Sequence, residues 1–106
     1  MPESTGALTE AVYYILLSLY KPLHGYGIMQ NVSALSRGRV TLGAGTLYGA
    51  INTLVEKGWI SPSGEDLESR KKEYAITSKG RSAVEAELRR LEELLANGRQ
   101  VTGGAE

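Results

Sequence analysis

The side chains with the most useful chemistry lie between residues 41 and 59, in the stretch TLGAGTLYGAINTLVEKGW. Apolar residues recur there with the spacing of one buried helix face; they are Leu47, Ala50, Ile51, Leu54 and Val55. The opposite face is small, polar and rich in hydroxyl groups; it carries Thr46, Tyr48, Gly49, Asn52, Thr53 and Glu56. Such a face can hydrogen-bond to a grooved polar surface, because hydroxyls suit phosphate oxygens and amides suit base edges.

Each position on this face can either contact a ligand or have an ordinary structural role such as packing, capping or solvation. The Tyr48 hydroxyl can bond a phosphate, or the ring can pack on a neighbouring turn. Asn52 can pair with adenine, or it is a solvated polar residue. Gly49 can let the helix approach DNA closely, or it is a tolerated helix glycine. Thr41 and Thr46 flank the helix start, where hydroxyls and free N–H groups suit a phosphate, although capping explains them equally well.

A basic run follows at Arg70, Lys71 and Lys72. If these residues form a strand, 70 and 72 point to one side and 71 to the other. Tyr74 and Ile76 share the parity of 70 and 72 and are expected to face the core. Phosphate contact by at least one of the three basic residues is therefore predicted, the alternative being a solvated strand edge. Acidic residues at 65, 66 and 68 would repel phosphates at the hairpin tip.

The helices and strands that carry these side chains can be located from N-cap residues and from helix-breaking glycine and proline. Helices are expected over 9–20 with Thr9 as N-cap, over 24–36, and between Gly45 and Gly58. Strands are expected over 59–63 and 70–76, with the polar linker 64–69 as the hairpin loop and Pro62 marking an edge strand or strand end. A last helix starts at Thr77 and ends at Asn97-Gly98. This order predicts a mainly α (α+β) winged helix-turn-helix with a two-stranded wing and a C-terminal dimerisation helix.

The last helix carries a narrow leucine seam of the coiled-coil type. It could pack on its own domain, but we expect it to contact the first helix and the same helix of a second subunit. The predicted dimer interface consists of Val12, Leu16, Val84, Leu88, Leu91, Leu94 and Leu95. An effector pocket is expected beside it, lined by Tyr13, Tyr14, Leu17, Leu88 and Leu91.

Bulk composition limits the function classes. The chain has 106 residues, no cysteine, one histidine and a formal net charge of zero. Disulfides and thiolate metal sites are excluded, and the lone His24 is expected to cap the second helix or pack beside Tyr26 rather than bind metal. We expect no cofactor and no enzymatic activity. Without a signal peptide or a membrane-spanning run, a cytoplasmic protein is expected. The predicted divisions are a flexible segment 1–7, a winged domain 8–76, a dimerisation helix 77–97 and a disordered tail 98–106.

Several segments in this order resemble the PadR family of bacterial transcriptional regulators. They are LHGYGI at 23–28, GTLYGAI at 45–51, LVEKGWI at 54–60, and RKKEYAIT with SKG at 70–80. The resemblance covers roughly residues 8–97 and is to the short, PadR-like subfamily with one helix after the wing. One departure is that the only tryptophan, Trp59, begins the wing, whereas much-studied short members have one in the last helix.

The resemblance implies a homodimeric repressor that binds an inverted-repeat operator in double-stranded DNA. It also implies a possible small hydrophobic or aromatic effector between the subunits. A winged-helix protein–protein adaptor without a DNA role is the alternative, favoured by the zero net charge and the acidic wing tip. A metal-sensing wing protein is a third reading, which the missing cysteines and the single histidine oppose.

Overall fold

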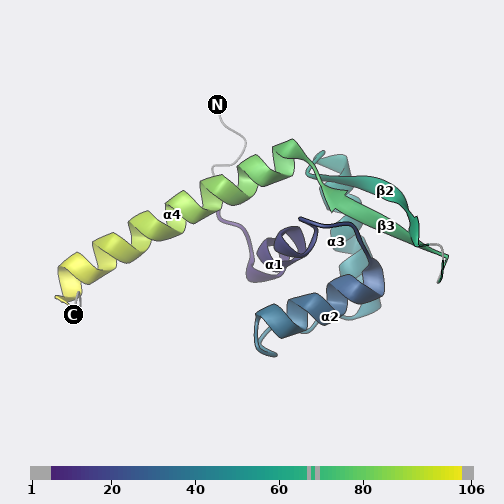
Figure 1. Cartoon of the computed structure of the whole chain (residues 1–106). Coiled ribbons are helices and arrows are strands. Elements are labelled where there is room, and N and C mark those ends of the chain that lie inside the picture. Colours follow the sequence, from purple (N-terminus) through teal and green to yellow (C-terminus); the bar gives the residue numbers. More distant parts are fainter. Residues whose placement is uncertain (1–5, 67, 69, 104–106) are drawn as a thin grey trace.

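The computed structural model describes residues 6–66, 68 and 70–103. In chain order the elements are α1 (Glu10–Ser18), β1 (Leu23–His24), α2 (Gly25–Leu35), α3 (Ala44–Glu56), β2 (Ile60–Asp66), β3 (Lys71–Ile76) and α4 (Ser78–Thr102). Helices α1 to α3 and the β2–β3 hairpin form one body, and α4 extends away from it (Figure 1). The expected order of a winged helix-turn-helix followed by one long helix is confirmed.

Three helix starts are fixed by the side chains that the sequence indicated. The hydroxyls of Thr9 and Thr77 accept hydrogen bonds from the backbone N–H three residues further on, at 3.1 and 3.0 Å. His24 caps α2 in the same way, because its Nδ1 accepts from the N–H of Gly27 at 3.1 Å. Each cap satisfies a helix N–H group that has no partner inside the helix. The capping role expected for His24 is therefore confirmed.

The sheet has three antiparallel strands in the order β1-β3-β2, whereas two were predicted. The two residues of β1 pair with β3, Leu23 lying opposite Tyr74. A two-residue strand leaves no periodic signal, so the sequence could not reveal it. The edge position of β2 agrees with Pro62, and a register shift follows between Pro62 and Gly64. Strand β2 continues through residue 66, so the connecting loop is shorter than the predicted 64–69.

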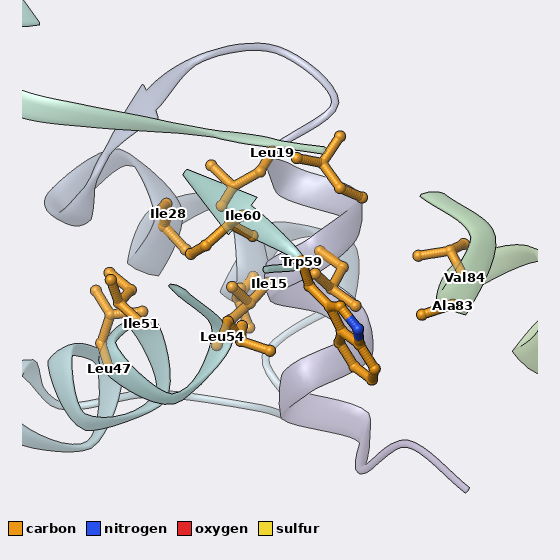
Figure 2. Close-up of a cluster of buried hydrophobic side chains, with 13 residues drawn as sticks. Ile15, Leu19, Ile28, Leu47, Ile51, Leu54, Trp59, Ile60, Ala83 and Val84 are labelled. Atoms are coloured by element: carbon orange, nitrogen blue, oxygen red, sulfur yellow. The ribbon is translucent and has the colours of Figure 1, made fainter. Parts of the chain in front are cut away.

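The core lies where α1, α2, α3, β2 and the first turns of α4 meet (Figure 2). It contains Ile15, Leu16, Leu19, Ile28, Val32, Leu47, Ile51, Leu54, Trp59, Ile60, Ile76, Ala83 and Val84. Ile76 is buried and Tyr74 partly buried, as their strand parity predicted. Val55, which was expected on the buried face of its helix, is 37% exposed.

Helix α4 is longer than predicted. It passes through Asn97 and Gly98 and ends after Thr102, where Gly103 takes a left-handed φ of 70°. An interior glycine costs a helix only about 1 kcal/mol, so the Asn-Gly pair was a weak stop signal. Residues 98–102 of the predicted disordered tail are therefore helical. Residues 104–106, like 1–5 of the predicted flexible segment, lie outside the described residues.

Candidate nucleic-acid interface

Helix α3 buries one face and presents the opposite one to solvent. Leu47, Ile51 and Leu54 are at most 1% exposed. With 3.6 residues per turn, the line directly opposite them runs along Gly45, Gly49, Asn52 and Glu56, all of which are exposed. Thr46 and Thr53 flank this line on one side and Tyr48 on the other. The structure thus brings the predicted residues of α3 together on one accessible surface, which we call the α3 outer face.

At two positions of the α3 outer face, Gly45 and Gly49, no side chain projects from the helix backbone. A Cβ built at Gly45 or Gly49 would meet nothing within 4 Å, so neither glycine is required by packing inside the chain. Neither has a positive φ, so the backbone conformation does not require glycine either. A helix that omits side chains at its most exposed positions can bring its backbone close to another surface. The sequence pattern pointed to Gly49 but not to Gly45, because the helix was expected to begin after Gly45, whereas α3 begins two residues earlier, at Ala44.

The start of α3 offers backbone donors. Its N-cap is Gly43, and no side chain among the described residues caps it. Free N–H groups at a helix N-terminus attract anions such as phosphate. Thr41 and Thr46 are exposed beside this end. Thr53, two turns later, donates its hydroxyl hydrogen to the Gly49 carbonyl oxygen at 3.2 Å, so it can offer a ligand only its acceptor capacity.

Tyr48 packs on the first turn of α2 and remains 45% exposed. A Cβ at Gly25 would come within 2.1 Å of the Tyr48 hydroxyl oxygen, so the tyrosine occupies the space that glycine leaves open. The Tyr48 ring therefore packs on a neighbouring turn, which was one of its two expected roles. Tyr48 also lines a hollow between α3 and the wing.

That hollow has a volume of 390 Å³ and joins α2, α3 and β3. It is lined by Tyr26, Met29, Ala44, Tyr48, Lys71, Lys72 and Tyr74. The Lys71 ammonium lies 5.6 Å from the centre of the Tyr26 ring, in cation–π contact. Tyr26 is 54% exposed and was missed as a site residue. The sequence feature that could have identified Tyr26 is its place in the first turn of α2, two residues after the N-cap His24.

The wing differs from the prediction at Arg70. This residue lies in the turn before β3 with a φ of 61°, so strand alternation does not apply to it. Lys71 and Lys72 are exposed in β3 and pair in register with Asp66 and Glu65 of β2. The opposite charge of Glu65 on the strand position facing Lys72 reduces the field of that lysine. The wing is therefore less basic than its sequence of three cations indicates.

The leucine seam of α4 is largely uncovered. Leu88, Leu91, Leu94 and Leu95 are 37–57% exposed. Val12 is partly buried against the core. Two predicted interface residues do not fit, because Leu16 is 0% and Val84 1% exposed, inside the chain's own core. The seam that a partner can reach therefore starts at Leu88.

A groove of 310 Å³ lies between α1 and α4. Of the residues predicted for an effector pocket, Tyr13, Tyr14 and Leu91 line it, whereas Leu17 and Leu88 do not. The rings of Tyr13 and Tyr14 meet edge to face with their centres 5.7 Å apart. Burial raises the pKa of Tyr13, and the neighbouring Tyr14 and Glu87 raise it further.

Glu87 is an acid in the wall of this groove that the sequence did not single out. It is only 5% exposed and forms a two-pronged ion pair with Arg90, from Nε at 2.9 Å and Nη2 at 2.5 Å. Its Oε1 also accepts from the N–H of Leu8 at 3.4 Å. The hydrogen bonds from Arg90 hold the pKa of Glu87 below its ordinary value, against the opposing effect of burial.

Within residues 6–66, 68 and 70–103, no three histidine, aspartate or glutamate side chains gather as metal ligands would. No helix among these residues is long and apolar enough to cross a membrane.

A three-helix body with an exposed polar third helix, a flanking hairpin and a hollow containing lysine and tyrosine between them is a winged helix-turn-helix domain. A model of the transcriptional regulator PadR-like family matches residues 14–86, and the chain belongs to this family. Its members regulate transcription and are not enzymes. No protein with a curated description matches the chain.

Solved structures share the whole architecture. A PadR family transcription regulator from Clostridium difficile R20291 matches with a TM-score of 0.73 and 22% identity, over 89% of this chain and 99% of that one. RosR from H. salinarum matches at 0.64 and 20%, over 93% and 99%. Sso10a-2, a DNA-binding protein from Sulfolobus solfataricus, matches at 0.62 and 17%, over 92% and 94%. At sequence identities this low, the matches show that the fold is shared and nothing more. Archaeal proteins are among the matches, so the fold is not restricted to bacteria.

Proposed function

We propose that the chain is a homodimeric, cytoplasmic repressor that binds an inverted-repeat operator through the α3 outer face. The observation that carries this proposal is the low, polar line of Gly45, Gly49 and Asn52 on an otherwise well-packed helix. Asn52 pairs with a base edge in the major groove. The glycines allow the approach that this contact needs.

Phosphate contacts come from groups on both sides of the α3 outer face. One backbone phosphate lies at the start of α3, near the N–H groups that no described side chain caps and near Thr41 and Thr46. A second lies at the hollow between α3 and the wing, where it meets the Tyr48 hydroxyl and the ammonium groups of Lys71 and Lys72. Phosphate contacts position the protein, whereas the contact of Asn52 specifies sequence.

The dimer forms through α4. Leucines at about half exposure along two helical turns are unusual on a helix that stays in water, and a coiled-coil-like seam covers such a stripe. A two-fold dimer would place its two α3 helices about 34 Å apart, one turn of DNA. A small apolar or aromatic effector in the Tyr13–Tyr14 groove at this interface would shift that spacing and release the operator.

The test is fluorescence anisotropy with DNA from upstream of the protein's own gene, next to a shuffled duplex, at two salt concentrations. We expect tight binding to the first duplex and weak, salt-erased binding to the second. Asn52→Ala should lower discrimination between the two by about 1–3 kcal/mol. Lys72→Ala should weaken both and reduce the salt slope by about one phosphate contact. The exposed α2 variant Gln30→Ala is the control.

Equal or absent binding to both duplexes would contradict the proposal and favour the protein–protein adaptor. The zero net charge and the position of Glu65 opposite Lys72 in the wing are the features that such an adaptor would use.

A further inference from the structure

A cavity of 360 Å³ lies on the flank of α3 and shares no lining residue with the hollow between α3 and the wing. It adjoins the α1–α4 groove at Leu8 and the α3 outer face at Thr53. One wall is the segment before α1 with the first turns of α1, and the other is the second half of α3. Its lining includes Leu8, Val12, Ala50, Leu54, Lys57 and Trp59. This volume is within the range of small-molecule sites, about 300–1,000 Å³.

The walls of the cavity are aliphatic, and each of their hydroxyl groups already takes part in one hydrogen bond. Leu8, Val12 and Leu54 contribute alkyl surface. The Thr9 hydroxyl caps α1, and the Thr53 hydroxyl donates to a carbonyl of its own helix. A ligand in this cavity therefore meets mainly apolar surface. The Thr53 hydroxyl hydrogen is already used, whereas the Thr9 hydroxyl, which accepts in its cap, can still donate to a carboxylate.

Lys57 is the one charged side chain in the lining. Its ammonium lies 5.1 Å from the centre of the Trp59 ring, which is itself 8% exposed. Within the described part of the chain, no carboxylate pairs with Lys57. Lys57 is exposed, so its ammonium stays in contact with water. An ammonium at the edge of apolar walls is suited to a carboxylate, because a charge-assisted hydrogen bond is stronger than one between neutral groups.

We propose that this cavity binds a small apolar carboxylate, with the alkyl body between Leu8, Val12 and Leu54 and the carboxylate on the Lys57 ammonium. This site shares Leu8 with the effector groove but is otherwise lined by residues of α1, α3 and Trp59 that the groove lacks, and the proposal does not depend on DNA binding. Its two walls connect it to the rest of the molecule. Lys57 caps the C-terminus of α3, and the N–H of Leu8 bonds to Glu87 of α4. An occupied site therefore contacts the base-reading helix directly and the dimerisation helix through one hydrogen bond.

The probe is octanoate, which is transparent where tryptophan is excited, and the readout is the fluorescence of Trp59, the only tryptophan. We expect a saturable change at about millimolar octanoate or below. Octanamide, which has the same shape and no charge, should bind about tenfold more weakly. Lys57→Met should reduce octanoate affinity to the same level, and Lys57→Arg should largely restore it. Lys79→Met is the matched control, because Lys79 lies near Trp59 but does not line the cavity.

A second measurement locates the ligand. In amide NMR spectra of the full chain, octanoate should shift Val12, Ala50 and Leu54, which line this cavity and not the α1–α4 groove. Shifts confined to Tyr13, Tyr14 and Leu91 would place the ligand in the α1–α4 groove and overturn the proposal. So would unchanged octanoate affinity in Lys57→Met, or the absence of saturation up to about 20 mM.

Discussion

The hydroxyl of Tyr48 on α3 occupies the space beside Gly25 on α2 that any larger residue at position 25 would fill. A Cβ at Gly25 would lie 2.1 Å from that hydroxyl oxygen and 2.7 Å from the ring carbon Cζ. Both distances are shorter than van der Waals contact, so position 25 controls where the Tyr48 ring lies. The relationship connects a glycine before the turn to a proposed phosphate-binding hydroxyl after it.

Gly25→Ala should displace Tyr48 and weaken operator binding by about tenfold, which corresponds to loss of one hydrogen bond to a charged group. Tyr48→Phe should cause a similar loss. Because both changes remove the same contact, the double variant should bind about as well as either single one, and anisotropy at fixed salt measures this cycle. Operator affinity equal to wild type in Gly25→Ala would show that the Tyr48 position does not matter for DNA.

Gly45→Ala and Gly49→Ala should have opposite effects on stability and on binding. Each should raise the free energy of unfolding by up to about 1 kcal/mol, because alanine favours helix and the added methyl meets no other group. Each should weaken operator binding, because the methyl holds the helix away from the base edges. Urea unfolding measures the change in the free energy of unfolding, and anisotropy on the same samples measures the change in operator affinity.

Ser82→Ala on the exposed side of α4 is the control for this pair of variants, since it raises helix propensity away from DNA. It should gain stability without losing affinity. If Gly45→Ala and Gly49→Ala behave like Ser82→Ala, the α3 outer face does not approach DNA closely.

Gly80→Ala should destabilise the fold by at least about 2 kcal/mol through overpacking. A Cβ there would come within 2.2 Å of the backbone oxygen of Trp59 and 2.7 Å of Ile76 Cγ1. Backbone atoms of a strand start cannot rotate away as a side-chain end can. The midpoint of urea unfolding should fall clearly, whereas a midpoint like that of wild type would mean that α4 can shift relative to the sheet.

Glu87 should make stability depend on acid pH. Arg90 lowers the pKa of Glu87 from its ordinary 4.5 in the folded chain. A lowered folded-state pKa contributes stability that is fully present above the unfolded value and is lost as pH falls through the folded value. Glu87→Gln should therefore reduce stability at about pH 7 and flatten its decrease toward about pH 3. Denaturation at both pH values and fixed protein concentration checks this, and parallel curves for the two proteins would contradict it.

The exposed seam of α4 should hold the dimer together. Leu91→Glu and Leu95→Glu place charges on a surface proposed to be buried, so both should sediment as monomers at micromolar concentrations where wild type is dimeric. Arg89→Glu, on the charged side of the same helix, should remain dimeric. Wild type that sediments as a monomer would remove the dimer from the proposed function.

Much of the architecture could be predicted because its signals are local. Thr9, His24 and Thr77 cap helices through bonds that span three residues, so neighbouring sequence contains the whole cause. The buried line of Leu47, Ile51 and Leu54 repeats with the helical period. The exposed face of α3 follows from the same period. The segments shared with the PadR family added the family itself and the expectation that the partner is operator DNA.

Only the tertiary structure decided where these surfaces meet other parts of the chain. Leu16 and Val84 belong to the same apolar stripes as Val12 and Leu88, and periodicity cannot tell whether a stripe faces its own core or a partner. The hollow with Tyr26 and the cavity with Lys57 each combine elements distant in sequence. The register that sets Asp66 and Glu65 opposite Lys71 and Lys72 depends on a bulge after Pro62. The sequence by itself determined the helices, their caps and the family, because those depend on neighbouring residues, whereas the sites depend on packing between elements that local patterns do not encode.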